Sequence, residues 1–193
     1  MKANKKSTAA LCGAAALLLA LSACGGDSTG KKQDDWAKGV CDQVGAQTKK
    51  INDANAQISK VDSGGKPADL KAADSAAFQS ISDAYESLAS IFTKAGPAPG
   101  DDGAKFQQNA VSAFNNLSSQ YAALKTKADA LDTSSQTKFA QSLKGVSDAL
   151  AKTVTGAETS LNTLREGDMG KALAKQPGCQ ATAPSGSASP SPS

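Results

Sequence analysis

Four long stretches of the chain place their large apolar side chains at steps of three and four residues, which is the spacing of one face of an α-helix. No stretch alternates with period two, so no β-strand is predicted. The connections between the stretches are short and rich in Gly and Pro. Short connections between helices of similar length favour an antiparallel up-down-up-down four-helix bundle, and the predicted fold class is therefore all-α.

Local signals predict where the helices begin and end. Asp34 or Asp35 is a good N-cap for the first helix, and Pro67 suits the first turn of the second. Thr133 and Gln136 form a capping-box pattern at the start of the fourth helix. Glycines weaken the helix within 167–175, so this segment is either the frayed end of the fourth helix or a short fifth helix.

The N-terminus has the pattern of an export signal. Lys2, Lys5 and Lys6 precede an apolar run over 11–21 that is too short to span a bilayer. The run ends in Leu-Ser-Ala-Cys, the pattern of a bacterial lipobox, with Cys24 as the residue that would be diacylated and become the mature N-terminus. The alternative is an ordinary secretory signal in which the cysteine is coincidental.

Removal of residues 1–23 changes the charge of the protein. The full chain has 21 basic and 18 acidic residues, and three of the basic ones are signal lysines, so 18 of each kind remain. A net charge of zero gives no reason to expect binding to nucleic acid or to anionic lipid. The expected lipid contact is instead the insertion of the acyl chains on Cys24 into the bilayer.

The cysteines predict one disulfide. Of the four, Cys12 lies in the signal and Cys24 is the lipid site, which leaves Cys41 and Cys179 in an exported, oxidising setting. In an up-down-up-down bundle the start of the first helix and the end of the fourth lie at the same, membrane-proximal end, where a bridge would close the bundle. Two free thiols, or a soft-metal pair completed by carboxylates or Met169, are the alternatives.

The absence of histidine excludes several classes of function. Ser-His-Asp and Cys-His nucleophile systems, H-E-x-x-H zinc sites and di-iron bundles all need it. Asp83 and Glu86 share a helix face, but a solvated polar face explains them as well. No nucleotide-binding glycine motif is present, and the Asp101–Asp102 pair lacks calcium-loop spacing. We therefore expect no enzyme, no metal site and no cofactor.

Three aromatic residues are the candidate contacts for a ligand or partner. Trp36 could stack on a ligand at the base of the bundle, or pack as the first core residue of its helix. Tyr85 and Tyr121 lie on apolar stripes, where each hydroxyl could reach a small internal pocket or the edge of the core.

The chain divides into four parts on these grounds. Residues 1–23 are a lipoprotein signal peptide, and 24–33 are a flexible tether of small and polar residues. The helical bundle covers 34–179, and 180–193 form a disordered tail rich in Ser, Pro and Ala.

Several of these motifs together resemble the small secreted lipoproteins of actinobacteria such as streptomycetes. They are the lysine-rich signal, Leu-Ser-Ala-Cys-Gly-Gly-Asp around Cys24, Asp-Asp-Trp-Ala-Lys-Gly-Val-Cys ending at Cys41, four Ala-rich helical stretches, and Pro-Gly-Cys ending at Cys179. The resemblance implies a location on the outer face of the cell membrane and supplies no catalytic residue.

The function predicted from the sequence is that of a lipid-anchored, non-catalytic binding or interaction module in the cell envelope, whose partner is an envelope protein. The alternative is an accessory carrier that binds a small apolar ligand between its helices for a transport or sensing system.

Overall fold

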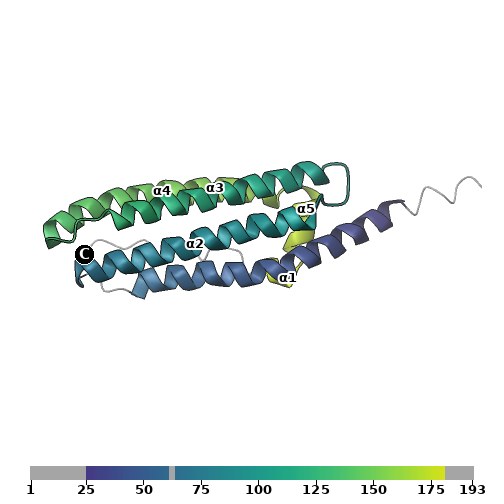
Figure 1. Ribbon diagram of the computed structural model, residues 1–193. Coiled ribbons are helices and arrows are strands. Elements are labelled where there is room, and N and C mark those ends of the chain that lie inside the picture. Colours follow the sequence, from purple (N-terminus) through teal and green to yellow (C-terminus); the bar gives the residue numbers. More distant parts are fainter. Residues whose placement is uncertain (1–24, 61–63, 181–193) are drawn as a thin grey trace, which may run out of the picture.

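The computed structural model describes residues 25–60 and 64–180 and shows an antiparallel four-helix bundle (Figure 1). This part of the chain is all-helical, as predicted, and contains no strand. The long helices are α1 (Gly25–Lys60), α2 (Pro67–Ala95), α3 (Gly103–Asp129) and α4 (Gln136–Arg165). Two short helices follow, α5 (Gly167–Ala174) and α6 (Pro177–Gln180).

Helices α2 and α3 form the most tightly packed pair of the bundle. Seven of the eight aromatic residues of the chain make one continuous row of ring contacts, and most of the row lies between these two helices. The row rests on heptad spacing in α2, where residues 78, 85 and 92 lie on one helical face. Its members are Phe78, Tyr121, Tyr85, Phe114, Phe92, Phe106 and Trp36.

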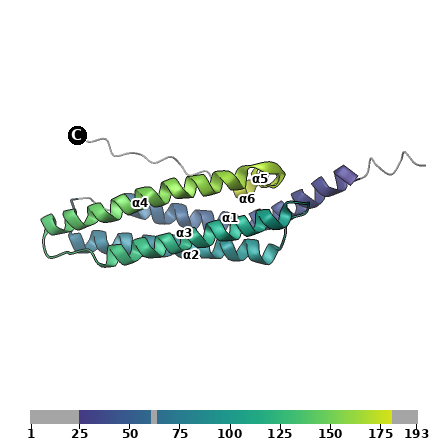
Figure 2. The ribbon, with the colours of Figure 1, turned by 90° about the horizontal axis from the view of Figure 1, so that it is seen from above.

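The edge between α1 and α4 is built differently. α1 packs on α2, α5 and α6, and α4 packs on α3 and α5, whereas the backbones of α1 and α4 do not come close together. Figures 1 and 2 show α5 and α6 bridging these two helices at one end of the bundle. We call this edge the α1–α4 edge; it is closed at one end by the short helices and by the disulfide.

The structure corrects two of the predicted helix starts. α1 begins at Gly25 instead of Asp34 or Asp35, so residues 25–33 continue the helix where a flexible tether was predicted. Once the helix is fixed in the bundle, each further residue adds a hydrogen bond without a new nucleation cost. At α4 the N-cap is Ser135, whose hydroxyl accepts a hydrogen bond from the Lys138 N–H at 3.3 Å, so the predicted Thr133 capping box is wrong.

The segment after α4 is a separate fifth helix. Gly167 has φ of 73°, a conformation that favours glycine, and the chain turns there before α5. The predicted signal 1–23, the lipid site Cys24 and the tail from 181 onward lie outside the described residues. The rest of the proposed domain division therefore stays a prediction.

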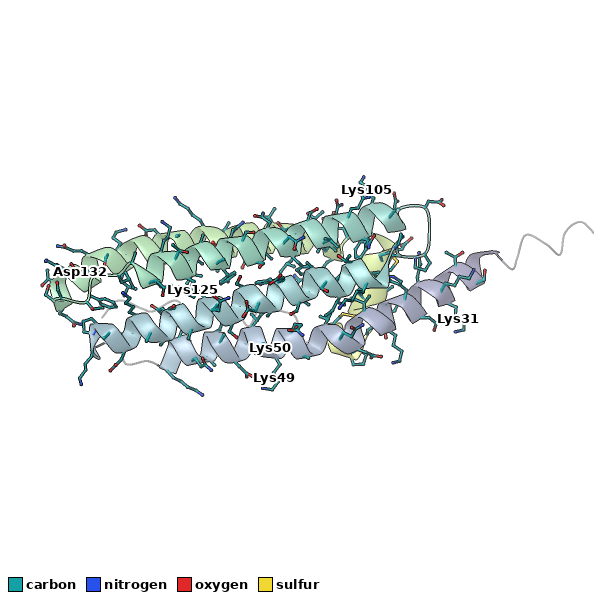
Figure 3. All side chains as sticks on the ribbon, viewed as in Figure 1. Lys31, Lys49, Lys50, Lys105, Lys125 and Asp132 are labelled. Carbon is teal, nitrogen blue, oxygen red and sulfur yellow. A yellow bond between two sulfur atoms is a disulfide. The ribbon has the colours of Figure 1, made fainter. Side chains whose placement is uncertain are left out.

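Charged side chains lie on the outer faces of the helices (Figure 3). Several form ion pairs one helical turn apart, such as Lys49 with Asp53 at 2.6 Å and Lys144 with Asp148 at 2.8 Å. Exposed pairs of this kind add only a few tenths of a kcal/mol each. None of the described helices combines the length and the apolar content needed to cross a membrane.

Candidate functional site

The predicted disulfide between Cys41 and Cys179 is present and joins α1 to α6. The two Cα atoms are 5.1 Å apart, which lies within the usual range for a bridge. Cys41 is fully buried. An ion pair between Lys175 and Asp34 at 3.7 Å lies at the same end of the bundle. The C-terminal segment of the bundle is thus tied to α1.

Gly178 explains why the residue before Cys179 is small. A Cβ atom at Gly178 would overlap the backbone carbonyl of Cys41, and a Cβ atom at Gly45 of α1 would lie 3.4 Å from the carbonyl oxygen of Gly178. α6 therefore approaches the backbone of α1 directly, and only glycine allows this approach.

Trp36 is half-buried at the same end of the bundle as the disulfide, on the face of α1 that meets α2. Its ring meets Phe92 and Phe106 edge to face, with centroids 6.0 and 6.1 Å apart, and its indole N–H donates to the Ala95 carbonyl at 3.3 Å. These contacts satisfy both the apolar body and the polar atom of the side chain. The structure therefore places Trp36 in the packing of the bundle end.

Tyr85 and Tyr121 are brought together in the middle of the aromatic row. Their ring centroids are 5.6 Å apart, and both residues are buried. Burial raises the pKa of both phenols above the usual value, and for Tyr85 the neighbouring Tyr121 adds to the effect. Both stay neutral at physiological pH. Their rings are packed against other rings, where a small apolar ligand would need open space.

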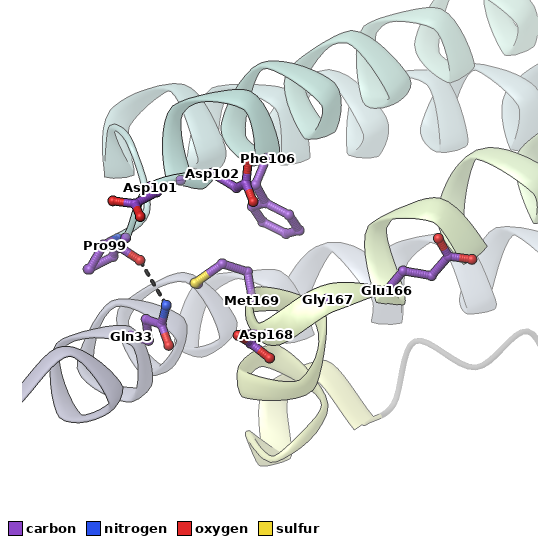
Figure 4. A pocket seen from close by; sticks show the side chains of 11 residues that line it. Gln33, Pro99, Asp101, Asp102, Phe106, Glu166, Gly167, Asp168 and Met169 are labelled. Atoms are coloured by element: carbon purple, nitrogen blue, oxygen red, sulfur yellow. Dashed lines mark hydrogen bonds between the residues drawn. The ribbon is translucent and has the colours of Figure 1, made fainter. Parts of the chain in front are cut away.

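A hollow of about 280 Å³ lies at the disulfide end, between the α2–α3 loop and the α4–α5 junction (Figure 4). The side chains of Phe106 and Met169 point into it, and four acidic residues are among those that line it: Asp101, Asp102, Glu166 and Asp168. On one side, the Gln33 side-chain amide of α1 donates to the Pro99 carbonyl at 3.0 Å.

The chemistry of this hollow is that of an acidic rim around an apolar floor. Such a surface favours cationic groups, because carboxylates are acceptors, and Asp168 already pairs with Lys171 at 3.3 Å. In the part of the chain that the structure describes, no group of three or more ligating side chains could hold a metal ion. The predicted pair Asp83 and Glu86 is exposed on α2, and Asp83 accepts from Gln79 at 2.7 Å.

A second, open hollow lies at the opposite end, over α2 and α3. Lys125 and the Ser75 hydroxyl both bond to Asp129, and these bonds lower the pKa of the Asp129 carboxyl. Lys71 donates to the Leu131 carbonyl at 3.2 Å. These contacts join the two helix ends next to the 130–135 connection, which is a structural task.

The α1–α4 edge is the feature that the sequence did not reveal. The apolar stripe of α4 is continuous in the sequence, so nothing in its periodicity distinguishes residues under α3 from residues on an uncovered flank. The acidic hollow was also missed, because its carboxylates come from two connections that are distant along the chain. The glycine at 167 was the available signal for a turn there.

No protein-family model, curated protein or solved structure matches this chain.

Proposed function

We propose that the protein is a cell-envelope lipoprotein, anchored on the outer face of the membrane through diacylated Cys24, and that its helical body is a non-catalytic interaction module. The observation that carries the proposal is the position of α1. This helix begins at Gly25, the residue after Cys24, and continues to Lys60 within the bundle.

The continuity of α1 supports an anchoring role. A lipid group on Cys24 would be joined to the bundle by helix, so the body would be held at a defined distance from the bilayer. The first turns of α1 project beyond the other helices, which leaves room between the bundle and the lipid surface (Figures 1 and 2). Two acyl chains give stable anchoring where a single chain is marginal.

The shape of the body supports interaction as its activity. The polar groups at the bundle ends are engaged in helix connections, and the aromatic residues are engaged in the core. What the bundle presents outward is a set of long helical faces and the α1–α4 edge. Faces of this kind contact other helices through apolar stripes.

The proposal is tested by the fate of the chain in cells that export lipoproteins. We expect labelled palmitate to be incorporated into the parent chain and the chain to partition into the detergent phase, whereas Cys24→Ala should abolish both. Cys12→Ala is the matched control, because it changes a cysteine of the signal that carries no lipid. Equal labelling and partition of the Cys24→Ala variant would contradict the proposal.

The interaction role is tested separately by crosslinking on intact cells. We expect the anchored parent to crosslink to an envelope protein, and we expect the yield to fall for variants on α4 but not for variants on the outer face of α2. A product that depends on neither face would contradict a role for the α1–α4 edge.

A further inference from the structure

The strongest unexplained surface is one flank of α4. The residues of α4 that pack inward are buried, namely Phe139, Val146, Thr153, Ala157 and Leu164. A second row lies one step around the helix and is only half-buried: Leu143, Leu150, Val154 and Leu161. Its three leucines pack against the core with part of their surface and leave the rest exposed. Small residues, Ser147 and Ala151, lie beside this row and are exposed. We call the second row and these two residues the outer flank of α4.

The position of α4 in the bundle explains why this flank is uncovered. In a closed four-helix bundle the fourth helix is covered by the first and the third. Here α4 packs on α3 and α5, and α1 stays away from it. Large apolar side chains that keep part of their surface in water favour a further contact, because covering this surface is worth about 25 cal/mol per Å².

The spacing of the four large residues is symmetric. They are separated by seven, four and seven positions, so the row is the same in either chain direction. Two such rows in antiparallel orientation place Leu143 opposite Leu161 and Leu150 opposite Val154, twice each. Steps of seven and four also separate some of the core positions of a two-helix coiled coil, in which the full repeat alternates in steps of three and four.

The charges next to the row have a similar symmetry, centred one residue away from that of the row. Lys144 and Glu158 lie on the same side of the row, seven residues before and after Ala151, whereas the row itself is centred on position 152; both charged residues are exposed. In an antiparallel pair Lys144 of one chain comes close to Glu158 of the other, and the contact occurs twice. In a parallel pair these positions would meet their own kind, with lysine beside lysine. In the single chain Lys144 pairs with Asp148. This pair is exposed, so exchanging it for a contact with Glu158 of the other copy would cost little free energy.

We propose that the occupant of the outer flank is the α4 helix of a second copy, and that the two copies form an antiparallel dimer whose two-fold axis passes beside Ala151, at the level of position 152. Small side chains at Ser147 and Ala151 let the two helix backbones approach. The pairing points the two α1 N-termini in opposite directions. The inference does not depend on lipidation, and it is tested on purified protein.

The first test locates the axis. The full chain carries Cys12→Ala and Cys24→Ala, so that an added cysteine is the only free thiol beside the Cys41–Cys179 bridge. With a short bismaleimide we expect Ala151→Cys to give a covalent dimer. The matched control is Lys152→Cys, the next residue, which lies on the opposite side of α4 and should stay monomeric. Equal crosslinking of the two variants would overturn the proposal.

The second test addresses orientation through sedimentation equilibrium. Glu158→Lys places two lysines against each other, and we expect it to weaken the dimer about tenfold at low salt. Lys144→Glu should have a similar effect, and the double variant should restore the parent affinity. Unchanged melting temperatures verify that the variants fold.

Three results would overturn the proposal. They are a parent protein that is monomeric at all concentrations, a dimer that ignores both single charge changes, and a double variant that remains as weak as the single ones. The last result would point to a parallel pair or to a different surface. Failure of palmitate labelling would leave this inference untouched, since only the anchoring proposal depends on it.

Discussion

The two halves of the bundle are held by different means. Between α2 and α3 the aromatic row packs ring on ring, with neighbouring centroids such as those of Phe92 and Phe114 only 5.4 Å apart. At the α1–α4 edge the two helix backbones lie farther apart than those of α2 and α3, and α1 is joined to the chain beyond α4 by the Cys41–Cys179 bridge and two short helices. Dense side-chain packing therefore holds α2 and α3 together, whereas a covalent link keeps α1 close to the chain beyond α4.

The largest effect is expected from loss of the bridge. The Cys41→Ser, Cys179→Ser double variant frees a loop of 138 residues, and the chain-entropy model gives a loss of up to about 5 kcal/mol in the free energy of unfolding. For a domain of this size that corresponds to a melting temperature lower by about 10 to 20 °C. Urea denaturation of the variant and of the reduced parent should agree. An unchanged midpoint would show that packing alone closes the edge.

A matched pair of phenylalanines sharpens the comparison. Phe78 on α2 and Phe139 on α4 are equally buried, at 2% exposure. We expect Phe78→Ala to cost about 3–5 kcal/mol, because its cavity lies between two helices that cannot collapse. Phe139→Ala should cost clearly less, since α4 has fewer neighbours and can shift to fill the space. Equal losses in denaturant titrations would mean that α4 is as firmly packed as α2.

The sequence contained the fold class, the disulfide and the start of α2, because these follow from spacing, cysteine count and turn residues. Pro67 lies in the first turn of α2 as expected. The start of α1 was missed because small polar residues such as those at 25–33 have no apolar stripe, and their helix is stabilised by continuity with the bundle. The N-cap of α4 was missed because Thr133, Ser134 and Ser135 are all suitable caps.

The candidate sites were harder to predict than the fold. Tyr85 and Tyr121 were correctly placed on apolar stripes, yet their stacking depends on the register between α2 and α3, which periodicity does not give. The uncovered flank of α4 depends on the distance between α1 and α4, and that distance depends on α5 and α6. A pattern within one helix carries no information about how far a distant helix lies from it.

A smaller effect is expected where α6 meets α1. Gly178→Ala should destabilise the protein by about 1–3 kcal/mol, because the added methyl group overlaps backbone atoms of Cys41 that cannot move aside. The control is Gly39→Ala on α1, the helix of Cys41, where no atom lies near the new methyl group; it should stabilise α1 by up to about 1 kcal/mol. Identical thermal shifts would show that α6 does not dock as closely as described.

The smallest effect is a pH dependence of the aromatic row. The pKa values of Tyr85 and Tyr121 are raised in the folded protein, while unfolded tyrosine titrates near pH 10. The two buried phenols therefore contribute fully to stability below about pH 10, and this contribution is lost as the pH rises toward their pKa values in the folded protein. The Tyr85→Phe, Tyr121→Phe double variant should lose less stability between pH 9 and about 11 than the parent. If the stability of the parent and of the double variant falls by the same amount over this pH range, burial does not keep the phenols neutral.

The most direct test of the difference between the two halves is native-state hydrogen exchange, followed by peptide mass spectrometry, on the oxidised and the reduced protein. If the bridge holds the α1–α4 edge, reduction should raise exchange across α4, α5 and α6 and around Cys41, while the amides of α2 and α3 between Phe78 and Tyr121 keep their protection. If reduction raises exchange equally in all four long helices, or in none, the account of two differently held halves is contradicted.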